Sequence, residues 1–196
     1  MRITLPTVFA ASLLLAGCAG EPAQDEPAPN EPAPNEPAPS DAPAAQDEQT
    51  GPPPNAAPVA ERGSAAECPY LDTAWVEEAN GQRVTDIGTD PRFDPPACVF
   101  WSYPDEPQLT VLVRHMPSPE EAMAVVDWAA PIEVTDPADQ PPGWNGGRAG
   151  GGVLPGAVGA LYAVAKGPVA VSVWTNQNES VKAQTVAEQV IATLGL

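Results

Sequence analysis

The sequence has little of what catalytic and nucleic-acid-binding proteins commonly use. Its 196 residues include one histidine, three cysteines and eight Lys or Arg against 26 Asp or Glu. With a formal net charge of -18, the chain repels phosphate backbones and anionic lipid headgroups, so we expect no nucleic-acid partner. Acidity of this kind is typical of an exported protein that must stay in solution.

Motifs for catalysis and for cofactor binding are also missing. His115 is the only ordinary general base at neutral pH, and no Gly-x-Ser-x-Gly elbow accompanies it. The glycines of residues 146–152 lack the Lys-Ser/Thr of a phosphate-binding loop and the spacing of a dinucleotide fingerprint. Asp86, Asp90 and Asp94 recur every four residues, but the prolines around them do not fit a calcium-binding loop. We therefore expect no enzyme activity, no metal and no cofactor.

No apolar run approaches the roughly 20 residues that a membrane-spanning helix needs. A shorter run, residues 8–16, follows a Met-Arg start and ends in the sequence Leu-Ala-Gly-Cys18. A short apolar core of this kind is typical of a cleaved secretory signal, and its last four residues have the form of a bacterial lipobox. We predict that residues 1–17 are a signal peptide. Cys18 would then carry lipid, including palmitate, on the extracytoplasmic face of the cell membrane.

The two other cysteines are Cys68 and Cys98. If Cys18 is lipidated, they form an even pair in an exported, oxidising compartment, which predicts a disulfide. Closing a loop of this length would stabilise the fold by about 3 to 4 kcal/mol. A metal or redox pair is the weaker alternative, because the two are far apart and no other cysteine or histidine lies near either.

Proline, alanine and acidic residues dominate residues 19–66, which contain no aromatic residue. A five-residue repeat, Glu-Pro-Ala-Pro-Asn or Glu-Pro-Ala-Pro-Ser, fills residues 26–40. Such a segment cannot bury enough apolar surface to offset its ordering entropy, and its prolines favour extended polyproline II. We predict that residues 18–66 are a disordered tether whose reach, on the order of 150 Å, holds the following domain in the cell wall.

Residues 67–196 have the composition of one globular domain and contain all five tryptophans. Asp72 and Ser118 predict helices that begin at residues 73 and 119, and an apolar stripe from Ala183 to Leu194 predicts a third. Alternating or continuous apolar runs predict five strands. These strands lie at residues 83–88, 97–103, 109–115, 158–164 and 169–175.

The predicted elements follow the order α-β-β-β-α-β-β-α. Hairpins interspersed with helices favour an α+β fold, here a two-layer sandwich of an antiparallel sheet of about five strands with helices mainly on one face. Residues 131–156 are rich in glycine and proline and lie between predicted elements, so we expect a long loop there.

Five residues are candidates for a binding surface, since aromatic residues often anchor interfaces. Trp144 lies beside the glycine-rich segment, Tyr70 lies near the predicted disulfide, and Tyr162 lies on a predicted strand. Arg114 and His115 end another strand. For His115, a half-exposed position without chemistry is the simpler interpretation.

Several motifs resemble those of a known family. They include Cys68-Pro-Tyr-Leu-Asp, Asn80-Gly-Gln-Arg-Val, Arg114-His-Met-Pro, Thr175-Asn-Gln, Val181-Lys-Ala-Gln and the run of residues 90–101. In these motifs the chain resembles an actinobacterial family of secreted lipoproteins, of the corynebacterial type, defined by domain of unknown function 2020. The resemblance covers about residues 67–196. It implies an exported, lipid-anchored protein with the disulfide, but no activity and no functional residues.

These features predict a non-enzymatic, lipid-anchored protein of the cell envelope whose domain binds an envelope protein or a small ligand. Two other functions stay open. A cell-wall hydrolase or accessory enzyme needs only two carboxylates about 5 to 9.5 Å apart, here in a cleft beside His115. The domain could instead be a sensor or chaperone subunit of a membrane complex.

Overall fold

The computed structural model describes residues 51–63, 66–154 and 159–196. The predicted signal peptide, Cys18 and the repeat of residues 26–40 lie outside the described residues. Within the part of the chain that is described, no helix is both long and apolar enough to cross a membrane. The described residues therefore comprise the predicted domain and the last part of the predicted tether.

Three helices lie where the sequence predicts them. The Asp72 carboxylate accepts the N–H of Trp75, and the Ser118 hydroxyl accepts the N–H of Glu121. These side chains satisfy backbone N–H groups that the first turn of a helix leaves without a partner. The helices are α1 (Thr73–Asn80), α2 (Pro119–Ala129) and α3 (Ser180–Leu194).

Seven antiparallel strands form one sheet in the order β1-β2-β3-β7-β6-β5-β4. The prediction of about five strands is wrong, because residues 131–156 contain two strands where we expected a loop. These two lack the apolar alternation that marks a strand, and pairing with a neighbour forms them instead. The strands are β1 (Asp86–Asp90), β2 (Ala97–Trp101), β3 (Pro107–His115), β4 (Asp136–Ala138), β5 (Asn145–Ala149), β6 (Leu161–Lys166) and β7 (Val169–Thr175).

Glycine makes the pairing of β5 with β6 possible. Gly146 lies opposite Val164 in the register, and a Cβ on Gly146 would collide with the backbone of Ala163. Only glycine therefore allows the two backbones to approach at this point. The same glycines favoured a loop in the sequence, which explains the error.

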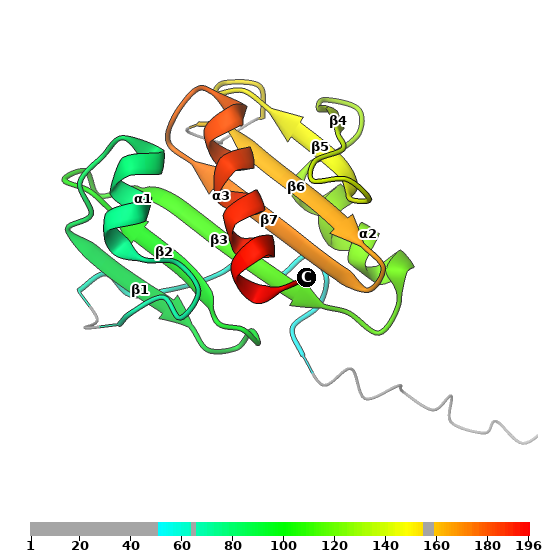
Figure 1. The fold of residues 1–196 in the computed structure, drawn as a ribbon, viewed down its shortest axis with the longest axis horizontal. Helices are drawn as coiled ribbons and strands as arrows, with labels where there is room; N and C mark the ends of the chain where they lie inside the picture. The colour runs from blue at the N-terminus through cyan, green and yellow to red at the C-terminus, as the bar shows by residue number, and fades with distance from the viewer. Residues whose placement is uncertain (1–50, 64–65, 155–158) are drawn as a thin grey trace, which may run out of the picture. The chain divides into compact units, whose positions relative to one another are not determined.

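Helices cover both faces of the sheet, as Figure 1 shows with α1 and α3 in front and α2 behind. On β7, Val171 and Val173 pack in one cluster with α1 and α3, whereas Ala170 packs in another with α2. Successive residues of a strand face opposite sides, and β6 and β7 are apolar on both. The expected two-layer sandwich is therefore corrected to three layers, with the sheet in the middle.

The predicted disulfide is present between Cys68 and Cys98. It joins the segment before α1 to β2 across a sequence separation of 30 residues. Both cysteines belong to the main apolar cluster. The bond therefore holds the start of the domain against the sheet.

Residues 51–63, which we assigned to the tether, pack on the domain; we call them the strap. Exposed and half-buried positions alternate along residues 51–60, so one side of an extended chain faces the protein. Ala56 packs against Phe93 and Leu112, on the same face of the sheet as α2. The domain therefore begins before residue 67, because it offers apolar partners that the tether's composition alone does not reveal.

The middle of the strap is anchored by a buried carboxylate on β1. Asp90 is 1% exposed and accepts the backbone N–H of Val59 at 2.8 Å. It also pairs with the Arg92 guanidinium at 2.6 Å, and Arg92 in turn donates to the carbonyl of Ala57 at 3.1 Å. Asp90 therefore holds the strap both directly and through Arg92.

The end of the strap is anchored at the opposite end of β1. Arg62 donates to Asp86 at 3.0 Å and to the carbonyl oxygen of Ser102 at 2.6 Å. Between the two carboxylates lies Gly88, where a Cβ would lie 2.7 Å from the carbonyl oxygen of Glu61. Two of the three regularly spaced aspartates, Asp86 and Asp90 of β1, thus hold the strap.

Replacing both cysteines, as in Cys68→Ala/Cys98→Ala, should lower the free energy of unfolding by about 3 to 4 kcal/mol. The reason is that the unfolded chain is no longer restricted by a closed loop. Urea denaturation followed by tryptophan fluorescence measures the change. Wild-type protein in reductant is the matched control and should lose the same free energy of unfolding. An unchanged urea midpoint in both samples would contradict the prediction.

The anchor at Asp90 should weaken in acid. Burial by itself raises the pKa of Asp90, but hydrogen bonds from Arg92 and Val59 outweigh it and hold the pKa below its ordinary value of 3.8. A lowered pKa stabilises the fold above the unfolded value, and this contribution is lost as the pH falls through the folded value.

We therefore expect the hydrogen-exchange protection factor of the Val59 amide to decline once the pH drops below about 4. Asp90→Asn should remove this dependence, because an amide does not titrate in this range. The amide of Val111 in β3 is the internal control and should keep its protection. Equal acid sensitivity of Val59 in the wild type and in Asp90→Asn would count against the anchor.

Candidate functional site

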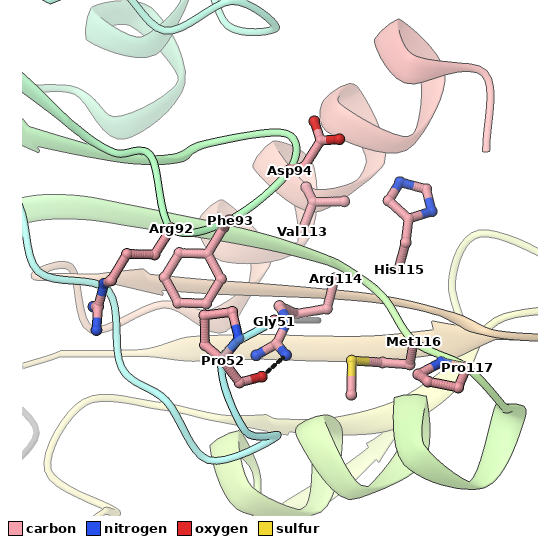
Figure 2. Close-up of a pocket in the computed structure, with 10 residues that line it drawn as sticks. All are labelled: Gly51, Pro52, Arg92, Phe93, Asp94, Val113, Arg114, His115, Met116 and Pro117. Carbon is pink, nitrogen blue, oxygen red and sulfur yellow. Dashed lines mark hydrogen bonds between the residues drawn. The ribbon is translucent and has the colours of Figure 1, made fainter. Parts of the chain in front are cut away.

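A cleft of about 450 Å³ opens at the start of the strap, beside the end of β3 (Figure 2). Its volume lies in the range of small-molecule sites, roughly 300 to 1,000 Å³. The lining combines the strap, the loop between β1 and β2, the last residues of β3 and the two residues that follow β3. These residues are Gly51, Pro52, Arg92, Phe93, Asp94, Val113, Arg114, His115, Met116 and Pro117.

The cleft exists because β3 runs past the end of its neighbour. β2 begins at Ala97, and its pairing with β3 reaches Val111. Residues 112–115 of β3 therefore lie beyond β2, next to the loop of residues 91–96. Three prolines in this loop have no N–H to donate to a sheet. The loop therefore does not extend β2, and the cleft takes the place of a longer strand.

Arg114 is the buried cation of the cleft. It is 6% exposed, and its guanidinium donates to the carbonyl oxygens of Pro52 and Pro53, the latter at 3.1 Å. It also lies 5.2 Å from the centroid of the Phe93 ring. Among the described residues no carboxylate forms an ion pair with it. Burial lowers the pKa of Arg114, yet a guanidinium stays protonated at neutral pH, so its charge is unmatched.

Phe93 separates this guanidinium from a second one. Arg92 lies 5.5 Å from the ring centroid, and Figure 2 shows the ring between the two arginine side chains. Unlike Arg114, Arg92 is neutralised by Asp90, and the hydrogen bond between them raises the pKa of Arg92. The two arginines are therefore not equivalent, because only Arg92 has a carboxylate partner among the described residues.

His115 and Asp94 lie at the rim. His115 is exposed and points to the opposite side of β3 from Arg114, as neighbours in a strand do (Figure 2). Asp94 is the single carboxylate among the lining residues. The hydrolase alternative needs two carboxylates in a cleft beside His115, and this cleft supplies one. Over the described ranges, no group of three or more His, Cys, Asp or Glu side chains is placed to hold a metal.

The three aromatic residues that we predicted at a binding surface lie in the core instead. Tyr70, Trp144 and Tyr162 are 3%, 2% and 1% exposed. The Tyr70 hydroxyl donates to the carbonyl of Pro96 and the Tyr162 hydroxyl to that of Gln140, at 2.9 and 2.7 Å. Burial raises the pKa of both tyrosines. Buried tyrosines normally find such partners, so these rings support packing. None of the three lines the cleft at Arg114, although Tyr70 contributes to the lining of a separate cleft beside α1 and α3.

The structure brings together only two of the five predicted surface residues, Arg114 and His115. Phe93, Arg92 and the start of the strap also line the cleft but were not among the predicted residues. One sequence signal for these residues was available. The chain has only eight basic residues, and an arginine between apolar residues needs hydrogen-bond acceptors if it is buried. The identity of those acceptors, two backbone carbonyls of the strap, carries no sequence signal.

The family described as "Domain of unknown function (DUF2020)" matches residues 53–196. The matched region contains most of the strap, the loop that carries Phe93, and the whole of β3. No curated protein matches the chain. Because the match covers well over half of the sequence, the chain belongs to this family, the domain of unknown function DUF2020.

Proposed function

We propose that the protein is a lipid-anchored, non-enzymatic binding protein of the cell envelope, whose ligand binds in the cleft at Arg114. The observation that carries the proposal is the Arg114 guanidinium, 6% exposed and without an ion-pair partner among the described residues. A buried charge is unfavourable unless it is paired. A ligand with a carboxylate or phosphate would provide the missing counter-charge.

The composition of the cleft supports a ligand with both an anionic and an apolar part. An arginine fork matches the two oxygens of a carboxylate or phosphate. Phe93 and Met116, which also line the cleft, suit an apolar neighbour of that group. The net charge of -18 disfavours a large polyanion such as nucleic acid, but for a small ligand bearing one anionic group the nearby charges matter most, because exposed charges more than about 8 Å away are largely screened at physiological ionic strength.

The anchoring part of the proposal rests on the sequence. A signal-like apolar run ends at Cys18, and a proline-rich segment follows it. Gly51, the first described residue of the strap, lines the cleft. The described part of the chain therefore begins at the proposed ligand site.

Cys18→Ala should move the protein from the membrane fraction to the soluble fraction, because alanine cannot accept lipid. Cell fractionation with immunoblotting measures the distribution, and labelling with a palmitate analogue should show the loss of acylation. Cys68→Ala/Cys98→Ala is the matched control and should stay with the membrane. Membrane retention of Cys18→Ala after signal cleavage would overturn the anchor.

Two simple probes, benzoate and inorganic phosphate, test the cleft. Each should shift the NMR signal of the Arg114 side-chain N–H saturably. The signal of Arg148, an exposed arginine on β5, should not respond in this way. Arg114→Gln should weaken binding of the better probe at least about tenfold, which corresponds to the loss of one charge-assisted pair.

Arg148→Gln provides the matched control and should bind as the wild type does. Two results would contradict the site. One is an equal response of both arginines, which would indicate nonspecific attraction. The other is the absence of a saturable response to either probe.

A further inference from the structure

The strap supplies both hydrogen-bond acceptors of Arg114. Its two terminal nitrogens donate to the carbonyls of Pro52 and Pro53, which are consecutive in the chain. Figure 2 shows the Pro52 carbonyl directed at the guanidinium inside the cleft. A carboxylate or phosphate offers two oxygens to the same fork. The strap therefore takes one N–H on each terminal nitrogen of Arg114, and these are the two nitrogens of the fork that an anionic ligand would use.

The strap is held unequally along its length. Near its end, Arg62 pairs with the Asp86 carboxylate, and in the middle the Val59 N–H donates to the ionised Asp90. At its beginning the acceptors are neutral carbonyls that face a charged donor. Each of these hydrogen bonds has at least one ionised partner and is charge-assisted. A carboxylate or phosphate would add a full opposite charge, which a carbonyl oxygen lacks, so its attraction to the guanidinium is stronger. An anion is therefore a better partner for Arg114 than the strap is.

We infer that residues 51–56 are an intramolecular competitor for the ligand of the cleft. With these residues in place, both terminal nitrogens of Arg114 donate to the strap. When a carboxylate or phosphate binds, residues 51–56 leave the domain while Val59 and Arg62 hold the rest of the strap. The inference rests on the proposed function, since it concerns the same site. Because coupling is reciprocal, a variant whose strap is held more loosely must bind the anion more tightly in the cleft.

Release has a consequence for the chain that leads toward Cys18. The six residues from 51 to 56 would join that chain and add up to roughly 20 Å to its extended length. Ligand binding would thereby increase the distance over which the domain can move from its anchor.

The test uses Ala56→Asn in the full chain. Ala56 is half-buried against Phe93 and Leu112, so a polar side chain there weakens strap packing and leaves Arg114 unchanged. Phosphate, followed through the Arg114 side-chain N–H signal, should bind this variant about fivefold or more tightly than the wild type. Val181→Asn, on the exposed face of α3, is the matched control and should bind as the wild type does.

Hydrogen exchange provides the second readout. In the wild type the Ala56 N–H donates to the Pro53 carbonyl at 3.0 Å, whereas the Val59 N–H donates to Asp90. Saturating phosphate should reduce protection at Ala56 and leave protection at Val59 unchanged. This pattern separates release of the first residues from general unfolding of the strap.

The outcomes separate the competition from the site itself. Tighter binding by Ala56→Asn, or binding by this variant alone, supports the competition. Equal phosphate affinity in the wild type and Ala56→Asn, with no change at the Ala56 amide, overturns the competition but leaves the cleft as a site. Absence of binding in both, or binding that survives Arg114→Gln, overturns the proposed function and the competition together.

Discussion

The pairing of β3 with β7 is the interaction on which the rest of the structure depends. Every other pair in the sheet joins strands that follow one another in the chain, whereas this pair joins two separate meanders. At one end of it, the Asn80 side-chain amide donates to Gln108 at 3.0 Å, and the Thr175 hydroxyl donates to Asn80. Asn80 and Gln108 are fully buried and satisfied. Such a network fixes the register of β3 against β7 and the position of the end of α1 beside them.

The same pairing determines where the cleft lies. β7 accompanies β3 to His115, while β2 pairs with β3 only as far as Val111. α2 packs mainly over β5, β6 and β7, so the other half of that face needs a different cover. The strap provides this cover. Ala56 packs on the apolar cluster, and Arg92 and Arg114 of the domain donate hydrogen bonds to the carbonyls of the strap. The start of the strap thereby lines the cleft at Arg114 together with the end of β3.

Much of the fold follows from local sequence signals. Caps at Asp72 and Ser118 predict helix starts because the first turn needs side-chain acceptors, whatever the rest of the chain does. Apolar runs located five strands, with ends shifted by a few residues in the structure. The parity of the cysteines predicted the Cys68–Cys98 bond. The extra strands β4 and β5 have no such signal, since a neighbouring strand supplies their hydrogen bonds.

The sequence by itself determined the class of the fold, its three helices, its disulfide and the arginine and histidine at the end of β3. Only the tertiary structure decided that Tyr70, Trp144 and Tyr162 are buried, that α2 covers the second face, and that proline-rich residues bind the domain. The reason is physical. Caps, periodicity and cysteine parity depend on neighbours in the chain, whereas burial and the partners of a charge depend on residues that folding brings together from far apart.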